Sequence, residues 1–208
     1  MQRVDAIFSR FYGHNPKPVI ELEYRNEFTL LVAIVLSART TDVGVNKITP
    51  KLFDIADSPR KMLDLGEEGL KAHISSIGLY NSKAKNIVKL SEVIESKYKG
   101  EIPRDFELLT ALPGVGRKSA NVFLNSALGV PAIAVDTHVF RVSNRIGLVS
   151  ERSVLAVERS LVRVIPEKWK LYAHHWLVLH GRYVCKARVP LCNKCIVSDL
   201  CDSRRENS

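Results

Sequence analysis

Hydrophobic residues recur at helical spacing along most of the chain. One amphipathic stretch runs from residue 84 to residue 94, and similar patterns fill residues 137–146, 153–164 and 166–183. The segment 28–36 is apolar on nearly every side, and because helical patterns flank it we expect a buried helix rather than a strand. No strand alternation or hairpin signal interrupts these patterns. They predict an all-α protein with about eleven helices and short connectors.

Residues that start or stop helices divide the pattern further. Asp42 is a candidate cap for a helix whose buried face extends to Ile55. Ser58 followed by Pro59 predicts another helix start, because proline suits the first helical position. A separate helix is expected to begin near Glu67. The first half of the chain is therefore predicted to be a succession of short helices.

A glycine-rich turn follows Leu112, in the sequence Leu-Pro-Gly-Val-Gly-Arg-Lys-Ser-Ala. Gly114 and Gly116 let the backbone approach another molecule closely, and the helix that follows begins with unpaired N–H groups that attract a phosphate. Lys118 lies in the first turn of this helix, where the positive end of the helix dipole disfavours an ammonium ion. A neutral lysine amine is a nucleophile, so phosphate binding and a reactive group are predicted side by side.

Asp136 follows at a spacing that returns the chain to the level of Lys118. About 13 helical residues climb roughly 20 Å, and the extended segment 130–136 can span about 23 Å back. Asp136 also suits the N-cap of the helix that starts at Thr137, a position that favours the ionised carboxylate. The spacing thus predicts an amine and a carboxylate at one phosphate-binding turn.

These motifs resemble the helix-hairpin-helix DNA glycosylases and, among them, the endonuclease III family. The hairpin corresponds to residues 106–128, Lys118 matches the family's Schiff-base lysine, and Asp136 in Val-Asp-Thr-His matches its catalytic aspartate. The resemblance covers nearly the whole chain and includes Ile-Gly-Leu-Tyr-Asn-Ser-Lys-Ala at 77–84. The turn taken alone also occurs in polymerases and ligases, where it only grips the DNA backbone. For Lys118 the alternative to a catalytic role is a simple phosphate contact. For Asp136 the alternative is a helix cap without a catalytic role.

The resemblance implies a two-lobed fold with DNA between the lobes. A central helical domain is expected at residues 21–130, and residues 1–20 combine with 131–208 into a discontinuous iron–sulfur cluster domain. The implied enzyme is bifunctional. It removes oxidised pyrimidines from duplex DNA through a Schiff base on Lys118, and then nicks the strand 3′ to the abasic site by β-elimination.

All four cysteines lie close together near the C-terminus, with the spacing C-x6-C-x2-C-x5-C; they are Cys185, Cys192, Cys195 and Cys201. In a reducing compartment such a group indicates a metal site rather than disulfides. Four thiolates suit either zinc or an iron–sulfur cluster, and the spacing leaves both open, with free structural thiols as a third case. The resemblance implies a [4Fe–4S] cluster held by the loop 185–201.

The resemblance also implies DNA contacts. Leu79 is expected to be the apolar wedge that fills the space left by an extruded nucleotide, with a core leucine as the alternative. Arg39 stands where the family commonly has glutamine, and it is expected to plug the base stack and contact the opposite strand. The N–H groups of Gly114 and Gly116 are expected to hold one phosphate, often together with a monovalent cation.

Further contacts are expected from His138, in the aspartate motif, and from the cluster loop. Basic side chains of that loop can meet DNA phosphates, although a solvated basic loop is the alternative. They are Lys186, Arg188 and Lys194.

Charge and hydropathy are consistent with a DNA-binding protein. Lys and Arg number 31 against 22 Asp and Glu, a net charge of +9 that suits a polyanionic partner. The longest apolar run, residues 30–36, is far too short to span a bilayer, and residues 1–20 lack the apolar region of a targeting signal. We expect a cytoplasmic, nucleoid-associated monomer that binds double-stranded DNA with damaged bases or abasic sites, and no membrane.

Three other functions compete with this one. A monofunctional adenine glycosylase would share the cluster and the aspartate, but that branch lacks a lysine at the position of Lys118. A non-catalytic hairpin module with a structural metal would bind DNA without cutting it. An electron carrier would account for the cysteines and leave the hairpin, the positive charge and Lys118 unexplained.

Overall fold

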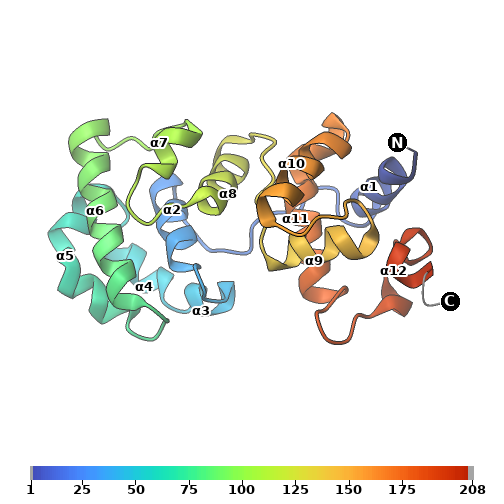
Figure 1. Ribbon diagram of the computed structural model, residues 1–208. Coiled ribbons are helices and arrows are strands. Elements are labelled where there is room, and N and C mark those ends of the chain that lie inside the picture. The colour runs from blue at the N-terminus through green and yellow to red at the C-terminus, as the bar shows by residue number, and fades with distance from the viewer. Residues whose placement is uncertain (1, 206–208) are drawn as a thin grey trace. The chain divides into compact units, whose positions relative to one another are not determined.

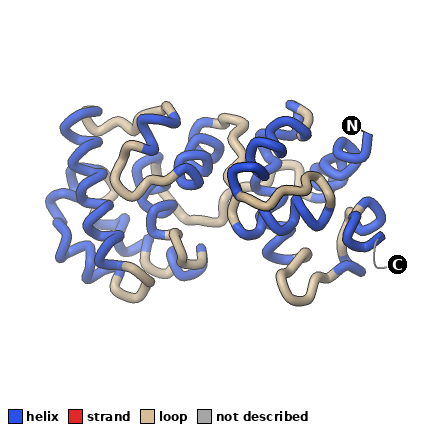
Figure 2. Tube along the Cα trace, in the orientation of Figure 1, coloured by secondary structure: helices blue, strands red, loops and turns tan. Residues whose placement is uncertain are grey.

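The computed structural model describes residues 2–205, and these residues form helices and turns without a strand (Figure 2). The predicted all-α class is confirmed. The chain divides into two compact units. One comprises Glu21–Leu128, and the other joins the N-terminal segment up to Ile20 with the chain from Gly129 onward. Every helix in the described residues is too short or too polar to cross a lipid bilayer.

The Glu21–Leu128 unit is built around one helix that is buried on all sides. Its helices are α2 (Glu27–Leu36), α3 (Asp42–Asn46), α4 (Thr49–Ile55), α5 (Pro59–Ile74), α6 (Tyr80–Tyr98), α7 (Phe106–Thr110) and α8 (Arg117–Leu128). Every residue of α2 after the first is buried, as the apolar run predicts. Helices α6 and α8 pack against α2, and α5 lies along α6 (Figure 1). An all-apolar helix is stable here because neighbours cover each of its faces.

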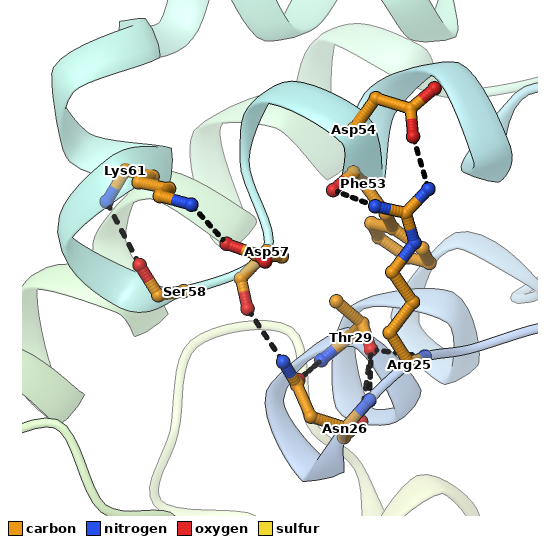
Figure 3. Close-up of polar contacts among 8 residues, drawn as sticks. All are labelled: Arg25, Asn26, Thr29, Phe53, Asp54, Asp57, Ser58 and Lys61. Carbon is orange, nitrogen blue, oxygen red and sulfur yellow. Dashed lines mark hydrogen bonds and ion pairs between the residues drawn. The ribbon is translucent and has the colours of Figure 1, made fainter.

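Polar contacts attach the start of α2 to α4 and to the start of α5 (Figure 3). The Asn26 side chain accepts a hydrogen bond from the Thr29 N–H at 2.9 Å, which caps α2. Its amide nitrogen donates to the Asp57 carbonyl oxygen, also at 2.9 Å. Arg25 donates to the Phe53 carbonyl oxygen at the end of α4, at 2.9 Å. The orientation of the central helix is therefore set by side chains just before it.

The helix expected from Asp42 to Ile55 is wrong, because two helices occupy this stretch. Thr41 rather than Asp42 is the cap of α3, and α3 ends at Asn46. Pro50 lies in the first turn of α4, where its missing N–H breaks no helical bond. Ile55, the last residue of the second helix, is 47% exposed instead of buried.

The predicted helix starts at α5 are confirmed. The Ser58 hydroxyl accepts a hydrogen bond from the Lys61 N–H at 3.3 Å and caps the helix. Gly66 inside α5 has a φ of 68°, outside the helical region, so the chain kinks where the sequence predicts that a new helix begins near Glu67. The glycine is required there because side chains rarely adopt this conformation.

The second unit brings the two ends of the chain together. Its elements are α1 (Gln2–His14), α9 (Thr137–Ile146), α10 (Val154–Val164), α11 (Glu167–Tyr183), the 3₁₀ turns η1 (Cys192–Lys194) and η2 (Ser198–Leu200), and α12 (Asp202–Arg205). Phe8 and Phe11 of α1 pack on Trp176 of α11, with ring centroids 6.0 and 6.5 Å from the indole. The Trp176 N–H donates to the Asn15 carbonyl oxygen at 2.8 Å. Aromatic burial therefore joins the N-terminal helix to α11.

Candidate functional site

Helices α7 and α8 form a hairpin around the glycine-rich turn. Asp105 caps α7 by accepting a hydrogen bond from the Glu107 N–H at 2.9 Å. Leu112 and Val115 in the turn are buried, and the Val115 N–H donates to the Leu112 carbonyl oxygen at 3.1 Å. Buried apolar residues thus alternate with exposed glycines. This alternation anchors the turn while its backbone faces outward.

Gly114 is required at its position for two reasons. Its φ is 80°, and a Cβ atom there would lie 2.9 Å from the Cβ of Asn86 on α6. Gly114 and Gly116 are exposed, and neither N–H has a protein acceptor among the residues that the structure describes. Two backbone donors beside a helix start form a site for an anion such as a phosphate.

Lys118 lies directly beyond these donors. Its side chain is exposed in the first turn of α8 and forms no ion pair with any described residue. The preceding Arg117 guanidinium lies 4.9 Å from the centroid of the Phe106 ring and braces the two helices of the hairpin. The amine is therefore held on a rigid hairpin and is not neutralised by a carboxylate.

Asp136 caps α9 as the sequence predicts. Its Oδ1 atom accepts hydrogen bonds from the N–H groups of His138 and Val139, both at 2.8 Å. The extended segment before it is anchored by buried residues from Ile133 to Val135. Lys118 belongs to one unit and Asp136 to the other, so their convergence stays a prediction.

Arg39 and Leu79 share an unusual backbone. Their φ angles are 55° and 61°, in the left-handed region that non-glycine residues seldom adopt. Both side chains are exposed, and Leu79 is 56% exposed at the N-cap of α6. The alternative of a core leucine is therefore wrong. Strained, protruding residues of this kind often occur at functional sites.

The four cysteines line one pocket in the second unit, together with apolar side chains. Cys185 follows the end of α11, Cys192 is the first residue of η1, and Cys195 and Cys201 directly follow η1 and η2. Burial raises the pKa of the Cys195 and Cys201 thiols, and a bound metal would stabilise their thiolate forms. No three His, Cys, Asp or Glu side chains of the described chain are arranged around a single metal ion.

Two arginines of α9 hold the start of the cysteine loop. The Arg141 guanidinium donates to the carbonyl oxygens of Cys185 and Gly181, at 3.0 and 2.8 Å. Arg145 donates to the Lys186 carbonyl oxygen at 2.8 Å and lies 3.8 Å from the Cys185 sulfur. N–H donors near a thiolate stabilise its charge, so these contacts suit a metal-binding loop.

The other predicted DNA contacts differ in exposure. The basic side chains of the loop are exposed and form no ion pair within the described residues. They are Lys186, Arg188 and Lys194. The His138 ring lies 3.3 Å from the Arg141 guanidinium and its Cβ packs close to Gly181 of α11, so this histidine has a packing role in addition to any DNA contact.

The comparisons with known proteins agree with this arrangement. The family model of the HhH-GPD superfamily base excision DNA repair proteins matches residues 32–167, which include the hairpin and Asp136. Endonuclease III of Rickettsia prowazekii (strain Madrid E) is 55% identical over 201 residues, which are 97% of this chain and 95% of that protein. This chain belongs to the endonuclease III family. It is therefore a base excision DNA repair enzyme.

Other members of the endonuclease III family show the same likeness. The Escherichia coli K12 enzyme is 51% identical over 200 residues, 96% of this chain and 95% of its own length. The solved structure of a trapped endonuclease III–DNA covalent intermediate is 46% identical, with a TM-score of 0.91, and covers 99% of this chain and 97% of that chain. A non-covalent endonuclease III–DNA complex matches equally well.

Sequence reasoning missed three residues of this endonuclease III homologue. Arg141 and Arg145 contact residues about 40 positions away, and nothing in their local pattern distinguishes them from surface arginines. Lys83 is buried, although the helical pattern predicts exposed lysines around the apolar face of α6. Only its position next to Ala84, on the edge of that face, could have indicated burial.

Proposed function

We propose that this enzyme is a bifunctional DNA glycosylase and abasic-site lyase that removes oxidised pyrimidines from duplex DNA. The observation that carries the proposal is the Lys118 amine, which is exposed, without an ion-pair partner in residues 2–205, and two residues beyond the outward-facing Gly116. The likeness to a trapped endonuclease III–DNA covalent intermediate supports a covalent route. The enzyme acts as a monomer on nucleoid DNA in the cytoplasm.

The reaction begins with extrusion of the damaged nucleotide. A base within the stack hides its sugar carbon, and turning it out costs a few kcal/mol, less where a lesion already weakens pairing. Leu79 enters the vacated space as an apolar wedge, and Arg39 plugs the stack beside the opposite strand. Their exposure supports these roles.

The hairpin holds the DNA backbone during the reaction. The N–H groups of Gly114 and Gly116 donate to one phosphate, with a monovalent cation able to share that site. Lys186, Arg188 and Lys194 contact further phosphates, and His138 lies near the aspartate. Phosphate contacts set the register without reading sequence, which suits an enzyme that must inspect many positions.

The chemical step uses Lys118 as a nucleophile. Its amine lone pair forms a bond to the anomeric carbon, and the bond from that carbon to the base breaks, so the base departs with the electron pair and takes up a proton. The attached amine loses one proton, and its nitrogen lone pair then breaks the bond from the anomeric carbon to the ring oxygen. The ring opens, that oxygen takes up a proton, and a protonated Schiff base forms. Loss of a proton from the adjacent sugar carbon then breaks the bond to the 3′ oxygen. The strand is nicked on the 3′ side of the abasic site.

Asp136 stabilises the positive charge that develops on the sugar or accepts a proton from the attacking amine. Both hydrogen bonds that cap α9 use its Oδ1 atom. The second carboxylate oxygen therefore remains for catalysis. A carboxylate fixed in orientation by a helix N-terminus is well placed to stabilise a developing positive charge.

The four cysteines hold a [4Fe–4S] cluster. They line one pocket together with apolar side chains, and four cysteine thiolates are the ligand set of such a cluster. The cluster is structural: it orders the basic loop and takes no part in base removal. Purified enzyme should be brown and contain about four iron and four sulfide per chain. A colourless protein with about one zinc would contradict this assignment.

Borohydride trapping tests the catalytic proposal. The enzyme is mixed with a duplex that contains one oxidised pyrimidine, the Schiff base is reduced, and a covalent protein–DNA band is sought. We expect the band in wild type and in Lys51→Ala, an exposed lysine of α4 that serves as the matched control. Lys118→Ala should give no band. Full strand cleavage by Lys118→Gln would refute the assigned role.

The same experiment separates the alternatives. Release of the base without a covalent band would indicate a monofunctional glycosylase, as in the adenine-specific branch. Binding without base release or a band would indicate a hairpin module that only grips DNA.

A further inference from the structure

Lys83 is a buried cation that has no carboxylate partner in the part of the chain that the structure describes. The residue is only 5% exposed on α6, and it forms no ion pair with any described residue. Its ammonium donates to the Leu36 carbonyl oxygen and to the Thr40 hydroxyl, both at 2.8 Å. Burial lowers the pKa of this amine. A buried charge is costly, so its presence here calls for a role that a leucine could not fill.

The acceptors explain how the charge is tolerated. Leu36 is the last residue of α2, and carbonyl groups at a helix C-terminus lack helical donors and carry the negative end of the helix dipole. The Thr40 side chain is confined as well, because its methyl group packs against Gly44, where an added Cβ would lie 3.2 Å away. Both acceptors are therefore fixed by contacts other than those with Lys83.

The lysine bridges two turns that each carry an exposed, strained residue. Its own N–H donates to the Leu79 carbonyl oxygen at 3.0 Å, in the first turn of α6. Its side chain bonds Thr40, which closes the turn around Arg39 through a hydrogen bond from its N–H to the Ser37 carbonyl oxygen at 3.0 Å. Arg39 and Leu79 both have left-handed φ angles. One residue thus contacts both turns, through its backbone and through its side chain.

We propose that Lys83 is a positioning residue that locks the 37–40 turn to the 77–80 turn, so that Arg39 and Leu79 enter the duplex as one rigid unit. The proposal rests on the proposed function, in which these two residues fill the space of the extruded nucleotide. Lys83 touches neither DNA nor the reacting atoms. It acts by keeping the spacing between the two protruding side chains constant, which a flexible loop would not do.

The test compares a substrate that needs both turns with one that needs neither. The first is a duplex with one oxidised pyrimidine opposite each of the four bases in turn. The second is a single strand with a preformed abasic site, which has no opposite strand and no stacked partner to replace. Lys83→Met should lower kcat/KM on the duplex about tenfold or more, as expected for loss of a charge-assisted contact, and reduce the differences among opposite bases. Borohydride trapping on the single strand should stay within about twofold of wild type.

Milder variants keep the test decisive if Lys83→Met folds poorly. Thr40→Val retains the side-chain shape and removes only the acceptor, so it should lower kcat/KM on the duplex by a smaller factor. Thr40→Ser keeps the hydroxyl and should retain the wild-type kcat/KM. The double variant Lys83→Met/Thr40→Val should be no worse than Lys83→Met alone, because both changes break one link. Lys89→Met removes an exposed lysine charge from the same helix and should behave as wild type.

Two results would overturn the proposal. Equal proportional loss on duplex and single strand would show that Lys83 only maintains the fold, and unchanged duplex activity in both Lys83→Met and Thr40→Val would show that the link does not matter. Failure of the proposed function itself looks different, because wild type would then give no covalent band on either substrate.

Discussion

The Oδ1 atom of Asp136 accepts a hydrogen bond from the Val139 N–H at 2.8 Å, so the proposed catalytic carboxylate is also the cap of α9. A cap and a catalyst need different properties of the same side chain. A cap needs an oxygen acceptor, which asparagine also provides, whereas charge stabilisation needs the negative charge. The two roles can therefore be separated by substitution.

Asp136→Asn should keep the cap and lose the chemistry. We expect the free energy of unfolding to change by less than about 0.5 kcal/mol, because asparagine caps a helix as well as aspartate does. Base release should fall about 100-fold or more. Asp136→Ala should lose the cap as well, at a cost of about 1 kcal/mol. Denaturant unfolding and single-turnover kinetics measure the two effects, and full activity in Asp136→Asn would leave the residue as a cap only.

The two exposed glycines of the hairpin should respond differently to alanine. Gly114→Ala should destabilise the fold by about 1 to 3 kcal/mol, because its φ of 80° and the 2.9 Å approach to Asn86 both exclude a side chain.

The new methyl group of Gly116→Ala meets no atom within 4 Å, so this variant should fold normally. It should still weaken DNA binding about fivefold, since a methyl group beside the phosphate disturbs a hydrogen bond. Thermal unfolding measures the change in stability, and fluorescence anisotropy with undamaged duplex measures the change in binding. Unchanged anisotropy in Gly116→Ala would show that the phosphate does not bind at this N–H group.

Arg145 should control the order of the cysteine loop. It donates to the carbonyl oxygens of Lys186 and Ala187, both at 2.8 Å. Removing these contacts in Arg145→Gln should expose the loop and raise its trypsin cleavage rate about tenfold, because local opening requires fewer hydrogen bonds to break. Arg152→Gln, an exposed arginine in a nearby turn, is the matched control. Equal cleavage of both variants would show that other contacts order the loop.

The buried His175 makes stability depend on pH. Burial lowers its pKa from 6.5 to about 4, so the folded state holds the neutral ring while the unfolded chain takes up a proton below pH 6.5. The contribution of His175 to stability is therefore complete above about pH 6.5, decreases as the pH falls and is lost below about pH 4, a total change of about 2 to 3 kcal/mol.

The variant His175→Gln cannot take up this proton. The slope of unfolding free energy against pH should become shallower in this variant between about pH 4 and 6.5, as urea unfolding at several pH values would measure. An unchanged slope would assign the acid sensitivity to other groups.

Local chemistry along the sequence accounts for most of the helices. The apolar run at residues 28–36 is buried as predicted, and α9 has the expected bounds at Thr137 and Ile146. Ser58 and Asp136 cap the helices they were expected to cap. These features depend on neighbours within about four residues, which is the reach of helical hydrogen bonds, and so the sequence predicts them without knowledge of the fold.

The sequence by itself thus determined the all-α class, most of the helices, and the hairpin with Lys118 directly beyond its glycines. The tertiary structure decided what no local pattern contains. Leu79 is 56% exposed at the start of α6, and Lys83 is buried because the end of α2 lies beside it, 47 residues away in sequence. Burial depends on which distant segments become neighbours, whereas helical periodicity reports only which residues share a face.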